Sequence, residues 1–150
     1  MYTMALIENK RAHLEYTILE EFEAGVELLG TEVKSLRAKR GKLEGARILV
    51  RGGEAYLVGA SIPAWQQANA PVKYDPERPR RLLLTQKEIL QVAEAEGQKG
   101  LTIIPIRVYN KKRVLKLLLA IARGKKKEDK RQYLKERDWK RQIERTLKNK

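Results

Sequence analysis

The sequence predicts a mainly β fold, a small closed barrel of antiparallel strands with short helices added to it. Three observations predict this class: short runs rich in β-branched and aromatic residues, turn-forming residues between such runs, and helical patterns that are few and short. A chain of 150 residues with 42% hydrophobic residues suits one domain with one core. We therefore expect five or six short strands, arranged in the manner of an OB-fold.

Two hairpins are the clearest local features of the sequence. Residues 46–51 and 54–58 flank Gly52-Gly53, a pair suited to the positive φ angles of a tight turn. Residues 101–109 and 114–122 are the arms of the second hairpin, which is joined through a polar turn. Both hairpins are antiparallel pairs, which is the arrangement that a barrel of this class needs.

A further strand and a long loop complete the β part of the prediction. Residues 14–22 are rich in β-branched and aromatic residues, and residues 26–29 extend this strand after a bend at Ala24-Gly25. Pro105 lacks a backbone donor, which indicates an edge position or a bulge in its strand. Residues 63–81 hold four prolines in a polar stretch, which predicts a long exposed loop.

Two short helices are expected between the strands. Thr31 caps the first of them, residues 32–38. The second, residues 86–96, follows Thr85, and Glu88 stands three residues after this threonine, which is the spacing of a capping box. The residues of the second helix that we expect to face inward are Ile89, Leu90 and Ala93.

The basic residues are concentrated in the last part of the chain. Residues 123–150 hold 13 Lys and Arg against 5 Asp and Glu, so this segment carries +8 of the net charge of +14. We therefore divide the chain into a barrel, residues 1–122, and a basic tail, residues 123–150. The tail has strong helix formers but only a narrow apolar stripe of Trp139, Ile143 and Leu147. Because this stripe buries too little to offset the entropy of ordering, we expect the tail to be disordered alone and helical on a partner.

Composition excludes several classes of function. Without cysteine there is no disulfide scaffold, thiolate zinc site or thiol nucleophile, and with His13 as the only histidine there is no His-rich metal site. Neither a GxxxxGK phosphate loop nor a GxSxG motif is present. No stretch has the ~18 uncharged apolar residues of a membrane span. We therefore expect a cytoplasmic protein that is not an enzyme, needs no metal or other cofactor and takes no small-molecule substrate.

The excess of basic residues predicts a polyanionic partner. A net charge of +14 and a pI of about 10.1 favour nucleic acid over an anionic membrane surface. Basic residues recur in loops and at helix ends near His13, Trp65 and Tyr74, as in a surface that follows phosphates and stacks a few bases. Because nothing in the sequence indicates base reading, recognition of a folded RNA by its shape and backbone is the more natural use.

Several ordered blocks of the sequence carry a resemblance to a known family. The most diagnostic block is GTEVKSLR at residues 30–37. The others are NKRAHLEY at 9–16, EFEAG at 21–25, DPERPRRLLL at 75–84, and the GKK, DKR and ER motifs followed by tryptophan within 124–139. Together they cover nearly the whole chain and resemble the SsrA-binding protein (small protein B) family.

This resemblance implies an OB-fold-like barrel that binds the tRNA-like domain of transfer-messenger RNA (tmRNA) and brings it to stalled ribosomes for trans-translation. The tail would enter the vacant messenger channel of the ribosome, near the decoding centre, and become helical there. The implied partners are therefore tmRNA and the ribosome.

The resemblance also implies which residues contact RNA. They include the second glutamate of EFEAG, which is Glu23, and the middle leucine of LLL, which is Leu83. They also include the residue two positions after that leucine, which is Thr85. Relatives usually have Asn or His where this chain has Thr85, which cannot stack but can cap the following helix. With the basic clusters, the predicted RNA-binding residues are Asn9, Lys10, Arg11, His13, Glu23, Lys34, Ser35, Arg37, Arg78, Arg80, Leu83 and Thr85. The predicted ribosome-binding residues are Lys125, Lys126, Asp129, Lys130, Arg131, Trp139 and Ile143, with Glu128 where relatives often have His or an aromatic residue.

Several alternatives stay open at this point. Leu83, Glu23 and His13 could have structural roles, and Trp139 and Ile143 could pack against the chain's own barrel. The protein could also be a ribosomal or ribosome-assembly protein with the same barrel, an RNA-modifying enzyme built on the glutamate-rich strand, or a protein whose tail binds a membrane surface.

Overall fold

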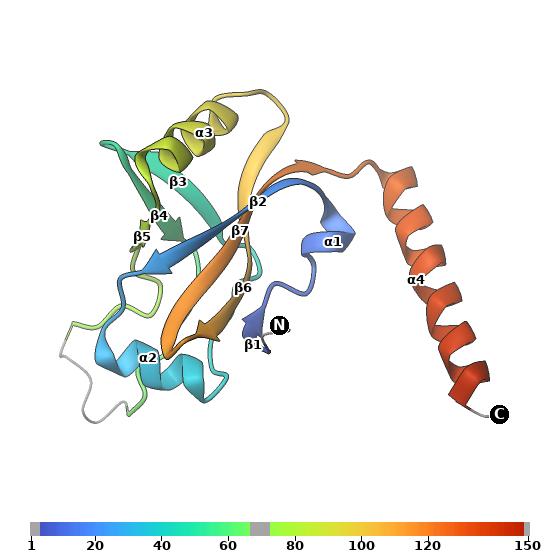
Figure 1. The fold of residues 1–150 in the computed structure, drawn as a ribbon, viewed down its shortest axis with the longest axis horizontal. Helices are drawn as coiled ribbons and strands as arrows, with labels where there is room; N and C mark the ends of the chain where they lie inside the picture. The colour runs from blue at the N-terminus through green and yellow to red at the C-terminus, as the bar shows by residue number, and fades with distance from the viewer. Residues whose placement is uncertain (1–3, 67–72, 149–150) are drawn as a thin grey trace.

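The computed structural model describes residues 4–66 and 73–148. These residues form seven strands in one antiparallel sheet and four helices (Figure 1). The strands are β1 (Ala5–Glu8), β2 (Tyr16–Val26), β3 (Arg47–Arg51), β4 (Glu54–Val58), β5 (Arg80–Leu83), β6 (Leu101–Lys111) and β7 (Val114–Gly124). The helices are α1 (Ala12–Glu15), α2 (Gly30–Arg37), α3 (Gln86–Glu96) and α4 (Lys127–Lys148). Across the sheet the strands follow the order β1-β6-β7-β2-β5-β4-β3.

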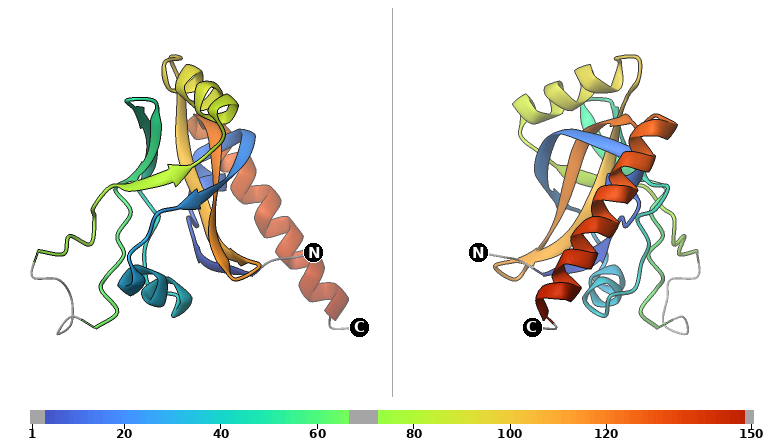
Figure 2. Two further views of the ribbon diagram at one scale, coloured as in Figure 1. Left: turned by 60° about the vertical axis from the view of Figure 1, so that its left-hand side comes forward. Right: turned by 90° about the vertical axis from the view of Figure 1, so that its right-hand side faces the viewer.

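The predicted class, mainly β and antiparallel with added helices, is confirmed, but the sheet does not close into the predicted barrel. Among the described residues no backbone ladder joins β1 to β3, the two ends of the sheet. The sheet nevertheless curves, so that Cα atoms of β3 come within 8 Å of Cα atoms of β6. Helix α3 packs against both of these strands (Figure 2). Side chains of α3 therefore cover the core between β3 and β6, where a closed barrel would have a further pairing of strands.

Both predicted hairpins are confirmed. Strands β3 and β4 pair on either side of Gly52 and Gly53, whose φ angles are 60° and 76°. Strands β6 and β7 are longer than expected and pair over their full length, from Leu101 opposite Arg123 to Lys111 opposite Val114. Pro105 lies at a bulge, because β6 is an inner strand between β1 and β7.

The predicted strand at residues 14–22 begins later and runs further. Leu14 and Glu15 belong to α1, and β2 continues from Tyr16 through Ala24 and Gly25, which pair with β7. The expected bend at these two residues is therefore wrong. The irregularity lies between Ile18 and Glu20 instead, and the strand ends at Val26.

Helix α2 begins earlier than predicted and has a different N-terminal contact. Its N-cap is Leu29, whose backbone N–H donates to Glu32 Oε1 at 2.7 Å. Thr31 lies inside the first turn, and its hydroxyl accepts a hydrogen bond from the backbone N–H of Trp65 at 2.7 Å. Thr31 is thus not the cap, and it connects α2 to the segment after Pro63.

Helix α3 has the predicted bounds but presents a different face to the core. Its buried residues are Ile89, Val92 and Ala95, whereas Leu90 is 65% exposed. Glu96, one turn after Val92, accepts a hydrogen bond from the backbone N–H of Val50 at 2.9 Å. Glu96 and Val92 thus lie on the face of α3 that meets the sheet, and the expected inward positions are corrected: Leu90 is exposed and Ala93 is only half-buried.

Apolar side chains pack on both faces of the long strands. The concave face carries the main core, in which Phe22, Leu117 and Leu119 pack with Leu36 of α2 and Val92 of α3. A second cluster on the outer face lies under α1 and consists of Ala12, Ile104, Ile106, Tyr109, Leu118, Ala120 and Ala122. Beyond this cluster the outer face carries the exposed side chains of Glu23, Leu83 and Arg107.

The basic tail forms α4, a helix that extends from the end of β7 beside α1 (Figure 1). None of its described residues is buried. Trp139 and Ile143 are 65% and 43% exposed, so neither packs into the body of the protein. No helix in residues 4–66 and 73–148 has the length and apolar character needed to cross a membrane.

Candidate nucleic-acid interface

A row of residues crosses four neighbouring strands on the open part of the outer sheet face. Tyr109 of β6 lies opposite Lys116 of β7, Lys116 lies opposite Gly25 of β2, and Gly25 lies opposite Leu83 of β5. Glu23 lies two residues before Gly25 and therefore on the same face of β2. The sheet thus gathers one aromatic, one acidic, one basic and one apolar side chain that are far apart in the sequence.

Glu23 is held in place by two donors from β6. The hydroxyl of Tyr109 donates to its Oε2, and Nζ of Lys111 donates to its Oε1 at 2.9 Å. The hydrogen bond from Tyr109 is the main cause of the lowered pKa of Glu23, and Lys111 lowers this pKa further. Burial and the contact with Glu23 raise the pKa of Tyr109 in turn. At neutral pH the face therefore presents an ionised carboxylate, oriented by the neutral phenol of Tyr109, which is itself buried.

Leu83 is an exposed apolar side chain at the β5 end of this row. It is 48% exposed, so it is not the core residue that its leucine neighbours suggest. A Cβ built on Gly25 would lie 3.3 Å from both Cβ and Cδ1 of Leu83. The glycine therefore allows Leu83 to lie against the backbone of β2.

The arrangement suits a ribonucleotide. Leu83 offers an apolar platform for a base or ribose, and the Glu23 carboxylate can accept from amino groups or 2′-hydroxyls but not from phosphates. Lys116 supplies the positive charge that a phosphate needs, and Arg107, whose guanidinium lies 5.8 Å from the Tyr109 ring centroid, adds a second cation. Lys111, Lys116 and Arg107 therefore lie around the oriented carboxylate of Glu23.

Sequence analysis missed Tyr109, Lys116 and Arg107 as members of this face, and it counted Lys111 only among the basic residues that recur in loops. The signal was present, because Arg107, Tyr109 and Lys111 alternate along β6 and so share one face of the strand. It was passed over because the apolar residues of the hairpin arms dominate the pattern. Lys116 could be placed only with the register, which pairs it with Tyr109.

Three of the predicted RNA-binding residues are buried and have structural partners. Asn9 is 8% exposed and donates from Nδ2 to the carbonyl of Pro105 at 3.1 Å, at the bulge of β6. Ser35 is fully buried and donates to the carbonyl of Pro63 at 2.6 Å. Arg80 is fully buried as well. The expected surface positions of these side chains are corrected, because each one satisfies a polar group inside the fold.

Arg80 belongs to a buried ion cluster centred on Glu32, which is itself fully buried. Arg80 donates to Glu32 Oε2 from Nε at 2.9 Å and from Nη2 at 2.6 Å, and Arg78 donates to both carboxylate oxygens. Tyr74 donates its hydroxyl to the carbonyl of Ile62 at 2.5 Å, and the same oxygen lies 3.2 Å from Glu32 Oε2. The cluster connects α2 to the segments on both sides of residues 67–72.

The pKa of Glu32 is lowered in spite of its burial. Burial by itself raises this pKa, but hydrogen bonds from Arg78, the Leu29 backbone and Arg80 outweigh that effect. The carboxylate therefore stays ionised inside the protein. Because Glu32 and Arg80 are also fully buried, unlike Glu23, they are positioned to hold the fold and not to contact a partner.

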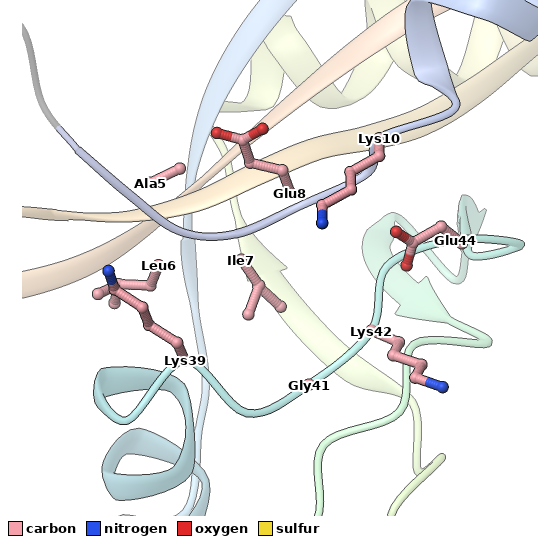
Figure 3. A pocket seen from close by; sticks show the side chains of 9 residues that line it. All are labelled: Ala5, Leu6, Ile7, Glu8, Lys10, Lys39, Gly41, Lys42 and Glu44. Atoms are coloured by element: carbon pink, nitrogen blue, oxygen red, sulfur yellow. The ribbon is translucent and has the colours of Figure 1, made fainter.

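Other predicted cations are exposed. Lys34 and Arg37 lie on this helix, and Arg37 donates from Nη2 to the carbonyl of Arg113 at 3.0 Å. Lys10 lines a hollow of about 720 Å³ between β1 and residues 39–44, into which Ile7 points (Figure 3). The structure thus places Lys34 and Arg37 at the α2 end, whereas Lys10 lies nearer the middle of β6, because the preceding Asn9 bonds at Pro105.

The remaining predicted residues of the body lie around α1. Arg11 is exposed and forms an ion pair with Glu15 at 2.8 Å. His13 has an exposed side chain, and its carbonyl accepts from Nζ of Lys125 at 2.5 Å. The backbone N–H of Lys125 also donates to the carbonyl of Glu15 at 2.8 Å, and its Nζ lies 4.0 Å from the ring centroid of Tyr133. Lys125 therefore anchors the start of the tail to α1.

Beyond this anchor the predicted tail residues lie along an accessible helix. Lys126, Asp129 and Arg131 are exposed, and Lys130 is half-buried. Trp139 and Ile143, with Leu147, line a shallow apolar hollow on one side of α4. Packing of this stripe against the chain's own sheet, one of the alternatives, is not what the structure describes.

Thr85 has its side chain occupied by the helix that it precedes. Its hydroxyl accepts from the backbone N–H of Glu88 at 3.2 Å, and the Glu88 carboxylate accepts from the backbone N–H of Thr85 at 3.0 Å.

We expect Thr85→Ala to lower the free energy of unfolding by about 1 kcal/mol, because a helix cap is lost, and Thr85→Ser to restore it. Urea titration of the two variants checks this, with RNA affinity unchanged in both. Weaker RNA binding by the Ser variant would show that Thr85 contacts RNA.

The described residues contain no cluster of three or more His, Asp or Glu side chains placed to hold a metal ion. The fold and the outer face together define a class, small basic β proteins whose open sheet face is suited to a nucleic acid. The family model described as "SmpB protein" matches residues 6–149, and the chain belongs to this family.

Curated relatives and a solved structure agree with this assignment. The "SsrA-binding protein" of Saccharophagus degradans is 47% identical over 142 residues, which are 95% of this chain and 89% of the relative. The protein of the same name from Synechococcus sp. (strain JA-3-3Ab) is 46% identical over 143 residues, 95% of this chain and 93% of the relative. A solved structure described as "tmRNA-SmpB: a journey to the center of the bacterial ribosome" matches with a TM-score of 0.68 and 42% identity. It covers 80% of this chain and 84% of that chain.

Proposed function

We propose that this protein binds the tRNA-like domain of tmRNA through the outer face of β2, β5, β6 and β7, and delivers that RNA to stalled ribosomes for trans-translation. The observation that carries the proposal is the row of Tyr109, Lys116, Gly25 and Leu83 beside the oriented Glu23 carboxylate. The names of the relatives and of the matching structure support the identity of the RNA.

The protein acts as a binding adaptor in this proposal. Its outer face holds the RNA while α4, anchored at its start through Lys125, extends a basic helix toward the messenger channel of the ribosome. It makes and breaks no covalent bond, since peptidyl transfer belongs to the ribosome. Its place of action is the cytoplasm, where ribosomes work.

Titration with a transcribed tRNA-like domain tests the RNA-binding part of the proposal. We expect wild-type affinity to fall roughly 10³- to 10⁵-fold between 50 and 200 mM salt, as for about 6–10 phosphate contacts.

Lys116→Gln should lower the slope of log K against log[salt] by about one unit. Leu83→Ala should leave this slope unchanged and reduce the preference for the tRNA-like domain over an unrelated hairpin of equal length.

Lys99→Gln is the matched control, because Lys99 is an exposed cation between α3 and β6, at the opposite end of β6 from Tyr109. Equal losses in Lys99→Gln and Lys116→Gln would contradict the assignment of the face. Equal wild-type affinity for ribosomal RNA fragments and the tRNA-like domain would favour a ribosomal or ribosome-assembly protein.

A further inference from the structure

Three cations of this chain have an unusual backbone conformation. Among the described residues, the non-glycine residues with positive φ are Lys39 at 61°, Lys112 at 50° and Arg113 at 71°. A left-handed backbone is unfavourable for residues with a Cβ, and Gly or Asn normally occupies such positions. All three departures from this rule are Lys or Arg.

The three cations occupy two different turns, each of which ordinarily uses glycine. Lys39 follows α2, where the backbone N–H of Arg40 donates to the carbonyl of Ser35 at 2.9 Å, the closing bond of a Schellman motif. Lys112 and Arg113 form the two-residue turn between β6 and β7. The chain uses Gly52-Gly53 in the equivalent turn between β3 and β4.

The two turns lie at the same end of the molecule. Arg37, in the last turn of α2, donates to the carbonyl of Arg113 at 3.0 Å and so joins the helix to the β6–β7 turn. Figures 1 and 2 show α2 and this turn at one end, with α3 at the opposite end. The β6–β7 turn follows directly after Lys111, which contacts Glu23, so the end is continuous with the outer face.

The charges of these three side chains are available to a partner. None of them forms an ion pair or a side-chain hydrogen bond with another of the described residues, in contrast to Arg78, Arg80 and Arg81, which are paired with carboxylates. Lys39 also lines the hollow beside β1, together with Lys10 and Lys42 (Figure 3). Backbone strain retained at exposed, unpaired cations is typical of a functional surface.

We propose that Lys39, Lys112 and Arg113 form a subsite for the phosphodiester backbone of the bound RNA, and that the chain keeps cations at these turns at the expense of backbone stability. The subsite extends the outer face around the α2 end and rests on the proposed function, since the RNA is the same. Its contacts are sequence-independent, because lysine and arginine there meet phosphates and not base edges.

Glycine substitution tests the subsite, because it removes the charge and relieves the backbone at once. The variants are the double substitution Lys112→Gly/Arg113→Gly and the single substitution Lys39→Gly in the full chain. We expect the salt slope for the tRNA-like domain to fall by about two units and one unit, respectively, and the affinity of the double variant at 0.1 M salt to fall at least tenfold. The melting temperature should be no lower than that of the wild type.

Matched controls are Lys87→Gln/Lys99→Gln for the double variant and Lys99→Gln for the single one, since both lysines are exposed at the α3 end. Unchanged slopes in the glycine variants, or equal changes in the controls, would overturn the proposal. A melting temperature well below wild type would do so as well, because it would assign the residues a structural role. If wild-type protein shows no preference for the tRNA-like domain over an unrelated hairpin, the proposed function fails, while the slopes still decide whether the subsite binds phosphates.

Discussion

Truncation after Lys126 is expected to abolish peptide tagging on stalled ribosomes while binding of the tRNA-like domain persists. The truncation removes α4, which has no buried residue, and keeps β7 and the contacts of Lys125 with α1. The melting temperature should therefore be unchanged. Binding is measured at 150 mM salt with competitor RNA, because the lost helix carries more basic than acidic residues and adds non-specific affinity. Tagging is measured in a purified translation system with a truncated message.

A second variant separates the role of the apolar side chains of α4 from the role of its charge. Trp139→Ala/Ile143→Ala leaves every charge in place and removes two exposed apolar side chains. We expect it to reduce tagging strongly with no loss of RNA affinity or stability. Full tagging by the truncated chain would contradict the role proposed for the tail, and parallel loss of specific RNA binding would contradict the division into barrel and tail, which stays a prediction.

Glu32→Gln is expected to destabilise the fold by about 3–5 kcal/mol at neutral pH, the usual cost of removing one partner of a buried ion pair. The substitution leaves Arg80, which is fully buried, and Arg78 without their carboxylate. The free energy of unfolding from urea titration measures the effect. The control is Glu27→Gln, which removes the same charge from a half-exposed pair with Arg81 and should cost no more than about 1 kcal/mol.

The difference between wild type and Glu32→Gln depends on pH in a defined direction. The folded-state pKa of Glu32 is lowered from its ordinary value of 4.5, so its contribution to stability is fully present above that value. It is lost as pH falls through the folded-state pKa, because the carboxyl group then becomes protonated in the wild type. We expect the two urea midpoints to converge in this acidic range. A difference that is constant from pH 7 to pH 3, or equal losses in Glu27→Gln, would contradict an ion-pair role for Glu32.

Features with a local cause were predictable from the sequence. The Gly52-Gly53 hairpin and the bounds of α3 depend on residues that lie within a few positions of each other, so the composition of each short segment determines them. The same holds for the net charge and for its concentration in the tail. The family blocks pointed to Glu23 and Leu83, and the register shows that they share one sheet face.

The sequence by itself therefore determined the two hairpins, helices α2 and α3, and where the positive charge lies, but not β1 or α1. Only the tertiary structure decided which polar side chains face inward: Arg80 meets Glu32 and Ser35 meets Pro63, across long separations in the chain. It also decided that α3 buries Val92 and exposes Leu90. The physical reason is that the burial of a side chain depends on partners brought together by strand register and helix packing, which no local pattern specifies.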